Sequence, residues 1–251
     1  VTQFQAQAYK ELLPPEGPVR TQIVGEITPD IEAQSQRVKE FMNYQISYEM
    51  EEYDHELDQM LFHLPLAGSS FKKVYYEGVK NRAVSKFVPA EDVVIPYNTT
   101  DMESCERVTH VVKMMGNELR KKQIGGMYRD VDISPSSVDN NDAEDKYNEL
   151  DGLTETQNAE DIVLLEFHCD LDIPGFEDKN ITTGEATGIK LPYVITVDEG
   201  TNKVLSIYRN YREGDPLRKK IQYFVHYKFL PALGFYGFGL IHMLGGLSRT
   251  A

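Results

Sequence analysis

Cysteine is scarce in this sequence. The 251 residues include two cysteines, Cys105 and Cys169, and their spacing matches no zinc-binding module. Two thiols cannot build the disulfide framework that holds many small secreted domains together. The residues after Val1 do not show the basic segment and apolar core of a secretory signal. The sequence therefore predicts two free thiols in a reducing, cytosolic environment.

Basic residues are also few for a chain of this length. Lys and Arg total 26 against 40 Asp and Glu, which gives a formal charge of −14. Because binding to nucleic-acid phosphates needs a dense basic face, this charge argues against a general nucleic-acid binder. Short basic runs are more often solvated edges or helix faces than binding sites. Two such runs could still meet phosphate or an acidic neighbour: Arg120, Lys121 and Lys122, and Arg218, Lys219 and Lys220.

The motifs of several enzyme classes are missing. The sequence contains no G-x-S-x-G nucleophile motif and no phosphate loop with its lysine. The glycine-rich run at residues 234–239 lacks that lysine, and His242 stands where a dinucleotide-binding motif has its third glycine. The sequence therefore predicts neither a cofactor nor a phosphate-loop ATPase, and we do not expect an enzyme.

The first third of the chain has the hydrophobic period of helices. Thr28 followed by Pro29 is typical of a helix start, and apolar residues from Val38 to Met50 then recur at helical spacing. Asp54 is a candidate cap for a second helix that ends at Pro65 and Gly68. Over this helical region, residues 28–66, we expect the apolar stripes to face a core.

From residue 71 the pattern changes to that of strands and hairpins. We expect strands over residues 71–77, 83–88, 93–96, 107–114, 162–173, 192–197, 204–211 and 220–229. Asn117 is the candidate cap of a short helix over 118–124, and the acidic residues 134–161 are expected to form a long exposed loop. Helices followed by hairpins predict an α+β fold, with N-terminal helices packed on a mixed or antiparallel sheet over 71–229.

The strand over 162–173 carries alternating polar residues. Glu166, His168, Asp170 and Asp172 fall on one face because side chains alternate along a strand. Imidazole and carboxylates can bind a divalent metal, which leaves a metal-dependent hydrolase as the alternative function. A strand with one solvated face explains the same pattern without a metal.

The tail from residue 229 to 247 contains no Asp, Glu, Lys or Arg. That length could span a bilayer, but Pro231, five glycines and the lack of a second such segment favour a buried or intersubunit helix over 234–249. Small and aromatic residues suit a tightly packed interface. The candidates for subunit contacts are Phe235, Tyr236, Phe238, Gly239, His242, Gly245 and Gly246.

Several runs in combination carry a resemblance to a known family. The first are Tyr-Asp-His-Glu-Leu-Asp-Gln-Met-Leu at residues 53–61 and His-Leu-Pro-Leu-Ala-Gly-Ser-Ser-Phe-Lys-Lys at 63–73. Shorter runs follow: Phe-Val-Pro-Ala-Glu-Asp at 87–92, Thr-His-Val at 109–111, Leu-Arg-Lys-Lys at 119–122 and Tyr-Arg-Asp-Val at 128–131. The last are Tyr-Phe-Val-His-Tyr-Lys-Phe-Leu-Pro at 223–231 and Gly-Phe-Tyr-Gly-Phe-Gly at 234–239. Together they resemble the portal, or head-to-tail connector, proteins of short-tailed bacteriophages.

The resemblance implies a structural part of a virion. Portal proteins form rings, usually of twelve subunits, at one capsid vertex, and DNA passes through the ring during packaging and ejection. Terminase, capsid and tail-adaptor proteins are the implied partners, and assembly is implied to take place in the host cytoplasm. The chain resembles the N-terminal wing region over residues 1–233, with the start of a stem helix over 234–251. We therefore expect a fragment of a longer protein.

Overall fold

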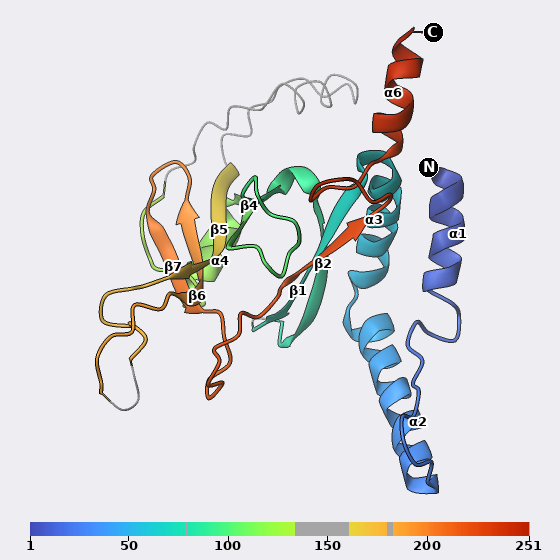
Figure 1. Ribbon diagram of the computed structural model, residues 1–251, viewed down its shortest axis with the longest axis horizontal. Helices are drawn as coiled ribbons and strands as arrows, with labels where there is room; N and C mark the ends of the chain where they lie inside the picture. The colour runs from blue at the N-terminus through green and yellow to red at the C-terminus, as the bar shows by residue number, and fades with distance from the viewer. Residues whose placement is uncertain (79, 134–160, 180–182, 251) are drawn as a thin grey trace. The chain divides into compact units, whose positions relative to one another are not determined.

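The computed structural model describes residues 1–78, 80–133, 161–179 and 183–250. The chain divides into two compact units (Figure 1). Unit 1 comprises residues 1–91, 99–104 and 222–251, and unit 2 comprises residues 92–98 and 105–221. Unit 1 is therefore assembled from both ends of the sequence.

Unit 1 begins with four helical elements. They are α1 (Thr2–Leu12), α2 (Pro29–Tyr44), the π-helical turn η1 (Gln45–Glu49) and α3 (Tyr53–Ala67). The predicted start of α2 is confirmed, because the Thr28 hydroxyl accepts a hydrogen bond from the Ile31 N–H at 3.3 Å and Pro29 follows as the first helical residue. The predicted end of α3 at Gly68 is also confirmed, and its φ of 84° lies in the left-handed region that glycine adopts freely.

Three details of these short helices differ from expectation. Asp54 lies in the first turn of α3 and does not cap it, because the helix begins at Tyr53. Pro65 lies inside α3, in its last turn. In unit 2, Asn117 lies inside helix α4 (Gly116–Ile124), whose N-cap position is Met115.

The core of unit 1 lies under α3. Leu57, Met60 and Leu61 are buried there, packed against side chains of α1 and of the neighbouring strand β2 (Arg82–Pro89). This confirms the prediction that the apolar stripe of α3 faces a core. The same prediction for α2 is wrong, since α2 contains no buried residue and no described part of the chain covers its apolar stripe.

The sheet of unit 1 has three antiparallel strands in the order β2-β1-β8. The predicted hairpin is confirmed as β1 (Ser69–Glu77) and β2. The third strand, β8 (Phe224–Lys228), comes from the far end of the chain and is shorter than the predicted 220–229. Helix α3 protects the outer edge of β2, because Glu56 Oε2 accepts the Phe87 N–H at 2.6 Å.

The described part of unit 2 is an antiparallel meander with helix α4 packed against it. Its strands pair in chain order, β3 (Val93–Val94), β4 (Arg107–Met115), β5 (Asp161–Leu171), β6 (Leu191–Asp198) and β7 (Val204–Arg209). A 3-10 turn, η2 (Ala90–Asp92), precedes β3, which is shorter than the predicted 93–96. The core of the unit consists of Met114, Leu119, Ile162, Leu164 and Leu205.

The predicted α+β class, with helices before antiparallel strands, is confirmed. The strands expected in one sheet over 71–229 lie in two sheets, one in each unit. The acidic segment expected over 134–161 lies outside the described residues, apart from Asp161, which begins β5. The last helix, α6 (Leu240–Thr250), begins later than the predicted residue 234.

Candidate functional site

The four alternating polar residues of the strand predicted over 162–173 do not form one cluster. Glu166 and His168 lie on the same face of β5, with Glu166 Oε1 2.6 Å from His168 Nε2. Asp170 is exposed near the end of β5, and Asp172 is exposed beyond it. Within the described residues, no group of three or more His, Cys, Asp and Glu side chains could hold a metal ion.

Glu166 and His168 occupy the buried face of the five-stranded sheet. His168 is only 5 % exposed, and the core residues Ile162 and Leu164 share its face by alternation. The expectation of a solvated face is therefore wrong for this pair. Leu119 of α4 packs over the same core. The alternation along β5 shows that the strand has two faces, but it does not show which face this helix covers.

A row of polar side chains crosses this buried face. The strand register places His110 opposite Glu166, Glu166 opposite Thr196, and Thr196 opposite Ser206. Tyr128 joins the row by a hydrogen bond with Thr196, and burial together with the Glu166 charge raises its pKa to about 12. An imidazole–carboxylate pair can exchange protons, but here the pair is enclosed within the sheet, which favours a structural network.

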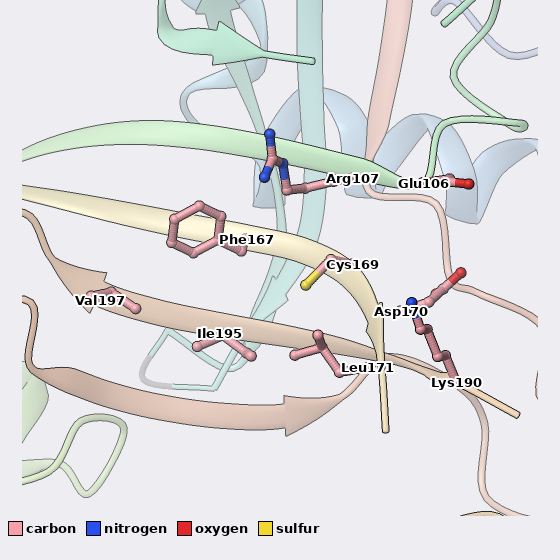
Figure 2. A pocket seen from close by; sticks show the side chains of 9 residues that line it. All are labelled: Glu106, Arg107, Phe167, Cys169, Asp170, Leu171, Lys190, Ile195 and Val197. Atoms are coloured by element: carbon pink, nitrogen blue, oxygen red, sulfur yellow. The ribbon is translucent and has the colours of Figure 1, made fainter. Parts of the chain in front are cut away.

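The opposite face of the sheet is partly open. It carries a cavity of about 550 Å³ with half-buried Phe167, Cys169, Leu171, Ile195 and Val197 in its wall. Figure 2 shows these side chains rising from β5 and β6, with Arg107 of β4 above them. The exposed charged residues Glu106, Arg107, Asp170 and Lys190 complete the lining. Phe167, Cys169 and Leu171, which alternate with the polar residues along β5, are thus the residues that solvent reaches.

The two basic triplets are largely engaged within the chain. Arg120 pairs with Asp130, and Lys122 Nζ lies 3.3 Å from Glu118 Oε1. Arg218 pairs with Asp178, and Lys220 Nζ donates to the Cys105 carbonyl at 2.6 Å. Lys121 and Lys219 are exposed. Three of the six cations pair with a carboxylate and a fourth is held by a backbone carbonyl, which weakens the triplets as phosphate-binding sites.

The tail residues predicted to contact other subunits separate into two groups. Residues 234–239 precede the helix, and Phe235 is buried at 6 % exposure in unit 1. Its ring stacks on His226, which stacks in turn on Phe71, with 4.5 Å between centroids in both pairs. Burial lowers the pKa of His226 to about 4, with a contribution from Lys228. Phe235 therefore belongs to the interior of its own unit.

Three glycines bring the tail into backbone contact with the end of α3. A Cβ atom on Gly239 would lie 2.1 Å from the Leu66 carbonyl oxygen, and one on Gly237 would lie 2.4 Å from the Gly68 carbonyl oxygen. The Gly237 N–H donates to Ser69 Oγ at 2.8 Å, and the same oxygen lies 3.1 Å from His226 Nε2. We call this contact of residues 68, 69, 237 and 239 the glycine joint.

Helix α6 leaves the glycine joint with an uncovered apolar side. His242 Nδ1 accepts the Gly239 N–H at 3.1 Å and so satisfies one donor at the helix start. The exposed apolar residues of α6 are Ile241, Met243, Leu244 and Leu247. Of the other interface candidates, Tyr236 and Phe238 are 42 % and 47 % exposed. A Cβ on Gly245 would lie 3.9 Å from Ile241 Cγ2, and one on Gly246 would meet open space.

Comparison of the chain with known protein families and with curated proteins finds no match. Across the described residues, no helix combines the length and the apolar character needed to cross a membrane.

Sequence reasoning missed the glycine joint and the open cavity. The joint had a usable signal, because glycines at 237 and 239 two residues apart often mark a close backbone approach. Its partner Gly68 was identified only as a helix stop. The cavity had no local signal, since it depends on which face of the sheet α4 covers.

Proposed function

We propose that this chain is the wing region of a bacteriophage portal protein, a subunit of a ring at one capsid vertex. The ring would be a conduit through which DNA is packaged and later ejected, and the full protein would contact terminase, capsid and tail-adaptor proteins. The proposal places the protein in the virion after assembly in the host cytoplasm. It gives the chain no catalytic role.

The observation that carries the proposal is the uncovered helix α6 on its glycine joint. Leu244 and Leu247 are 54 % and 68 % exposed, one turn apart on the same side of the helix. An apolar helix side that leaves a folded unit in this way needs a neighbour to bury it. A ring of identical subunits supplies such a neighbour to each copy. The portal-like sequence runs at both ends of unit 1 also support a ring-forming protein.

The charge of the chain supports a conduit that DNA slides through. With a net charge of −14 and three of its six triplet cations paired with carboxylates, the surface should not hold the duplex tightly. The metal-dependent hydrolase is less well supported, because Glu166 and His168 pair with each other in the sheet while Asp170 and Asp172 are exposed.

Negative-stain imaging of the complete protein to which we assign this chain tests the proposal. We expect rings with a central hole, usually of twelve subunits. The variant Leu244→Glu should lose the rings and keep its far-UV circular dichroism, because a charge would enter the side of α6 that a neighbouring subunit buries in the proposed ring. The matched control Lys86→Glu changes an exposed residue of β2 and should keep them. A complete wild-type protein that stays monomeric would contradict the proposal.

A further inference from the structure

One imidazole, that of His226, connects the tail to the sheet of unit 1. His226 lies on β8, opposite Phe71 of β1. Its ring stacks on Phe71 and on Phe235 of the tail, with 4.5 Å between centroids and 18° between ring planes in both pairs. Its Nε2 lies 3.1 Å from Ser69 Oγ, which accepts the Gly237 N–H of the glycine joint at 2.8 Å. The imidazole therefore contacts the neighbouring strand, the tail and the glycine joint at once.

The hydrogen bonds around His226 fit a neutral imidazole. Because Ser69 Oγ already accepts the Gly237 N–H, the serine hydroxyl can donate its own hydrogen to His226 Nε2. Protonation of the ring puts a hydrogen on Nε2, so the hydroxyl must turn its hydrogen away within a site where Ser69 is only 2 % exposed. An imidazolium would therefore disturb the bonds that hold Gly237 in the glycine joint.

The surroundings of His226 also oppose a positive charge on its ring. Burial and, to a smaller extent, Lys228 lower the pKa of His226 from 6.5 to about 4. Stacking on two aromatic rings offsets only part of the hydration that an imidazolium loses in such a site. Strand register places four further charged residues on the same face of the sheet, of which the last two lie opposite each other at its far end: Lys73, Lys86, Arg82 and Glu77.

The tail itself has few groups that titrate near neutral pH. Residues 229–247 contain no Asp, Glu, Lys or Arg, and their one histidine is His242 in the first turn of α6. The end of α3 that meets the tail, residues 66–68, is Leu-Ala-Gly. We propose that His226 is a pH-sensitive switch, whose neutral imidazole holds the tail on the sheet of unit 1 and whose protonation releases the tail together with α6. This inference does not depend on the proposed ring.

The sign and size of the pH dependence follow from the two states of the imidazole. While the tail is attached, the pKa of His226 is about 4, and solvent restores it toward 6.5 once the tail leaves. Between these two values the released state binds more protons than the attached state, so acid favours release. The equilibrium constant for release should be about 20-fold larger at pH 5 than at pH 7, as these two pKa values require.

Two tail amides report directly on this release. The Phe229 N–H donates to the Gly68 carbonyl at 3.0 Å, and the Gly237 N–H donates to Ser69 Oγ. Both bonds exist only while the tail is attached, so these amides exchange with solvent when it leaves. Hydrogen–deuterium exchange of the 251-residue chain, corrected for the intrinsic exchange rate at each pH, therefore measures the equilibrium constant. We expect the predicted increase in the tail and little change in β5 and β6.

Two variants assign the effect to one histidine. His226→Phe keeps an aromatic ring that cannot be protonated, so its corrected exchange should be the same at pH 5 and pH 7. The lost bond to Ser69 can raise exchange at both pH values and leaves this ratio unchanged. The matched control is His242→Gln, which removes the histidine of the tail and should keep the wild-type ratio.

The outcomes decide the inference without reference to rings. The same increase in wild type and in His226→Phe would overturn it, and so would its loss in His242→Gln. NMR titration of the wild-type histidines gives a second measurement that needs no folded variant. A His226 midpoint far below 6.5 supports the switch, whereas a midpoint near 6.5 would overturn it, because attachment would then not depend on the charge of the ring.

Discussion

At the scale of single residues, the buried amine of Lys72 is an unfavourable group in unit 1. Lys72 is 3 % exposed, and its Nζ has no hydrogen-bond partner. The amine lies 4.1 Å from the centre of the Tyr53 ring. Burial lowers its pKa from 10.5 to about 8, against the opposing effect of Glu56 and Glu52. A cation–π contact only partly replaces the lost hydration of an ammonium group.

We expect Lys72→Met to stabilise the protein by about 1–3 kcal/mol at neutral pH, because it removes an unsatisfied buried polar group. Glu52 and Glu56 keep their contacts with Arg82 and with the edge of β2. The folded wild type loses its proton near pH 8 and the unfolded chain near pH 10.5. Wild-type stability should therefore rise with pH over this interval, and the advantage of Lys72→Met should shrink.

Urea unfolding of the two proteins between pH 7 and 10 measures this difference. Lys86→Met on the exposed side of β2 is the control, and its effect should be small at every pH. A difference between wild type and Lys72→Met that stays constant with pH would contradict a buried, titrating amine.

At the scale of elements, the glycines of the tail fall into two classes that the sequence does not distinguish. Gly239 lies against the Leu66 carbonyl, whereas no atom stands within 4 Å of a Cβ built on Gly246. Gly239→Ala should cost about 1–3 kcal/mol, because the backbone of α3 must shift to admit a methyl group. Gly246→Ala should instead stabilise α6 by about 0.5–1 kcal/mol, since glycine is unfavourable within a helix.

Thermal unfolding followed by far-UV circular dichroism can compare these two variants. Both substitutions replace glycine by alanine in neighbouring parts of the tail. A change in composition therefore cannot explain why one lowers the free energy of unfolding and the other raises it. If Gly239→Ala left the midpoint unchanged, the glycine joint would not be a close backbone contact.

The elements that the sequence predicts well are those with local signals. Thr28 and Pro29 mark the start of α2, and Gly68 marks the end of α3, because capping depends on a few adjacent residues. The β1–β2 hairpin likewise follows from residues that turn the chain locally, including Asn81 with its φ of 52°. Such features need no knowledge of the remaining chain.

The features that sequence reasoning missed depend on distant partners. β8 pairs with β1, which lies more than a hundred residues earlier in the chain. The sequence near β8 therefore does not show that this strand belongs to the sheet of unit 1 and not to that of unit 2. The alternation along β5 identifies two faces, but only the position of α4 decides that Glu166 and His168 face the core. For the same reason the sequence placed Glu166 and His168 on one face but predicted neither their burial nor the open cavity on the other face.

At the scale of the whole molecule, charge governs the response to DNA. We expect a duplex Kd weaker than about 1 µM for this chain in ~0.15 M salt, where the Debye length of about 8 Å leaves each cation cluster to act alone. The net charge is −14, and Arg120 and Arg218 are paired with Asp130 and Asp178.

Fluorescence anisotropy with a labelled duplex measures this affinity. Lys121→Glu changes an exposed member of the first triplet, and it should alter the signal little if the triplets are not phosphate sites. Sub-micromolar binding at this salt concentration would contradict the expectation of a surface that releases DNA.

The discontinuity of unit 1 has a consequence for the order of events during protein synthesis. The main stretch of unit 2, residues 105–221, is translated before residues 222–251, which complete unit 1. At ~5–20 residues per second, β8 leaves the ribosome on the order of ten seconds after β2. Throughout that interval the nascent chain exposes one unpaired edge of β1. The Ser69 hydroxyl also lacks its hydrogen bond from the Gly237 N–H, because Gly237 is 168 residues downstream. Unit 2 is thus completed before unit 1, although unit 1 begins first in the sequence. The first helices synthesised acquire their last contacts only when residues 222–251 have been translated.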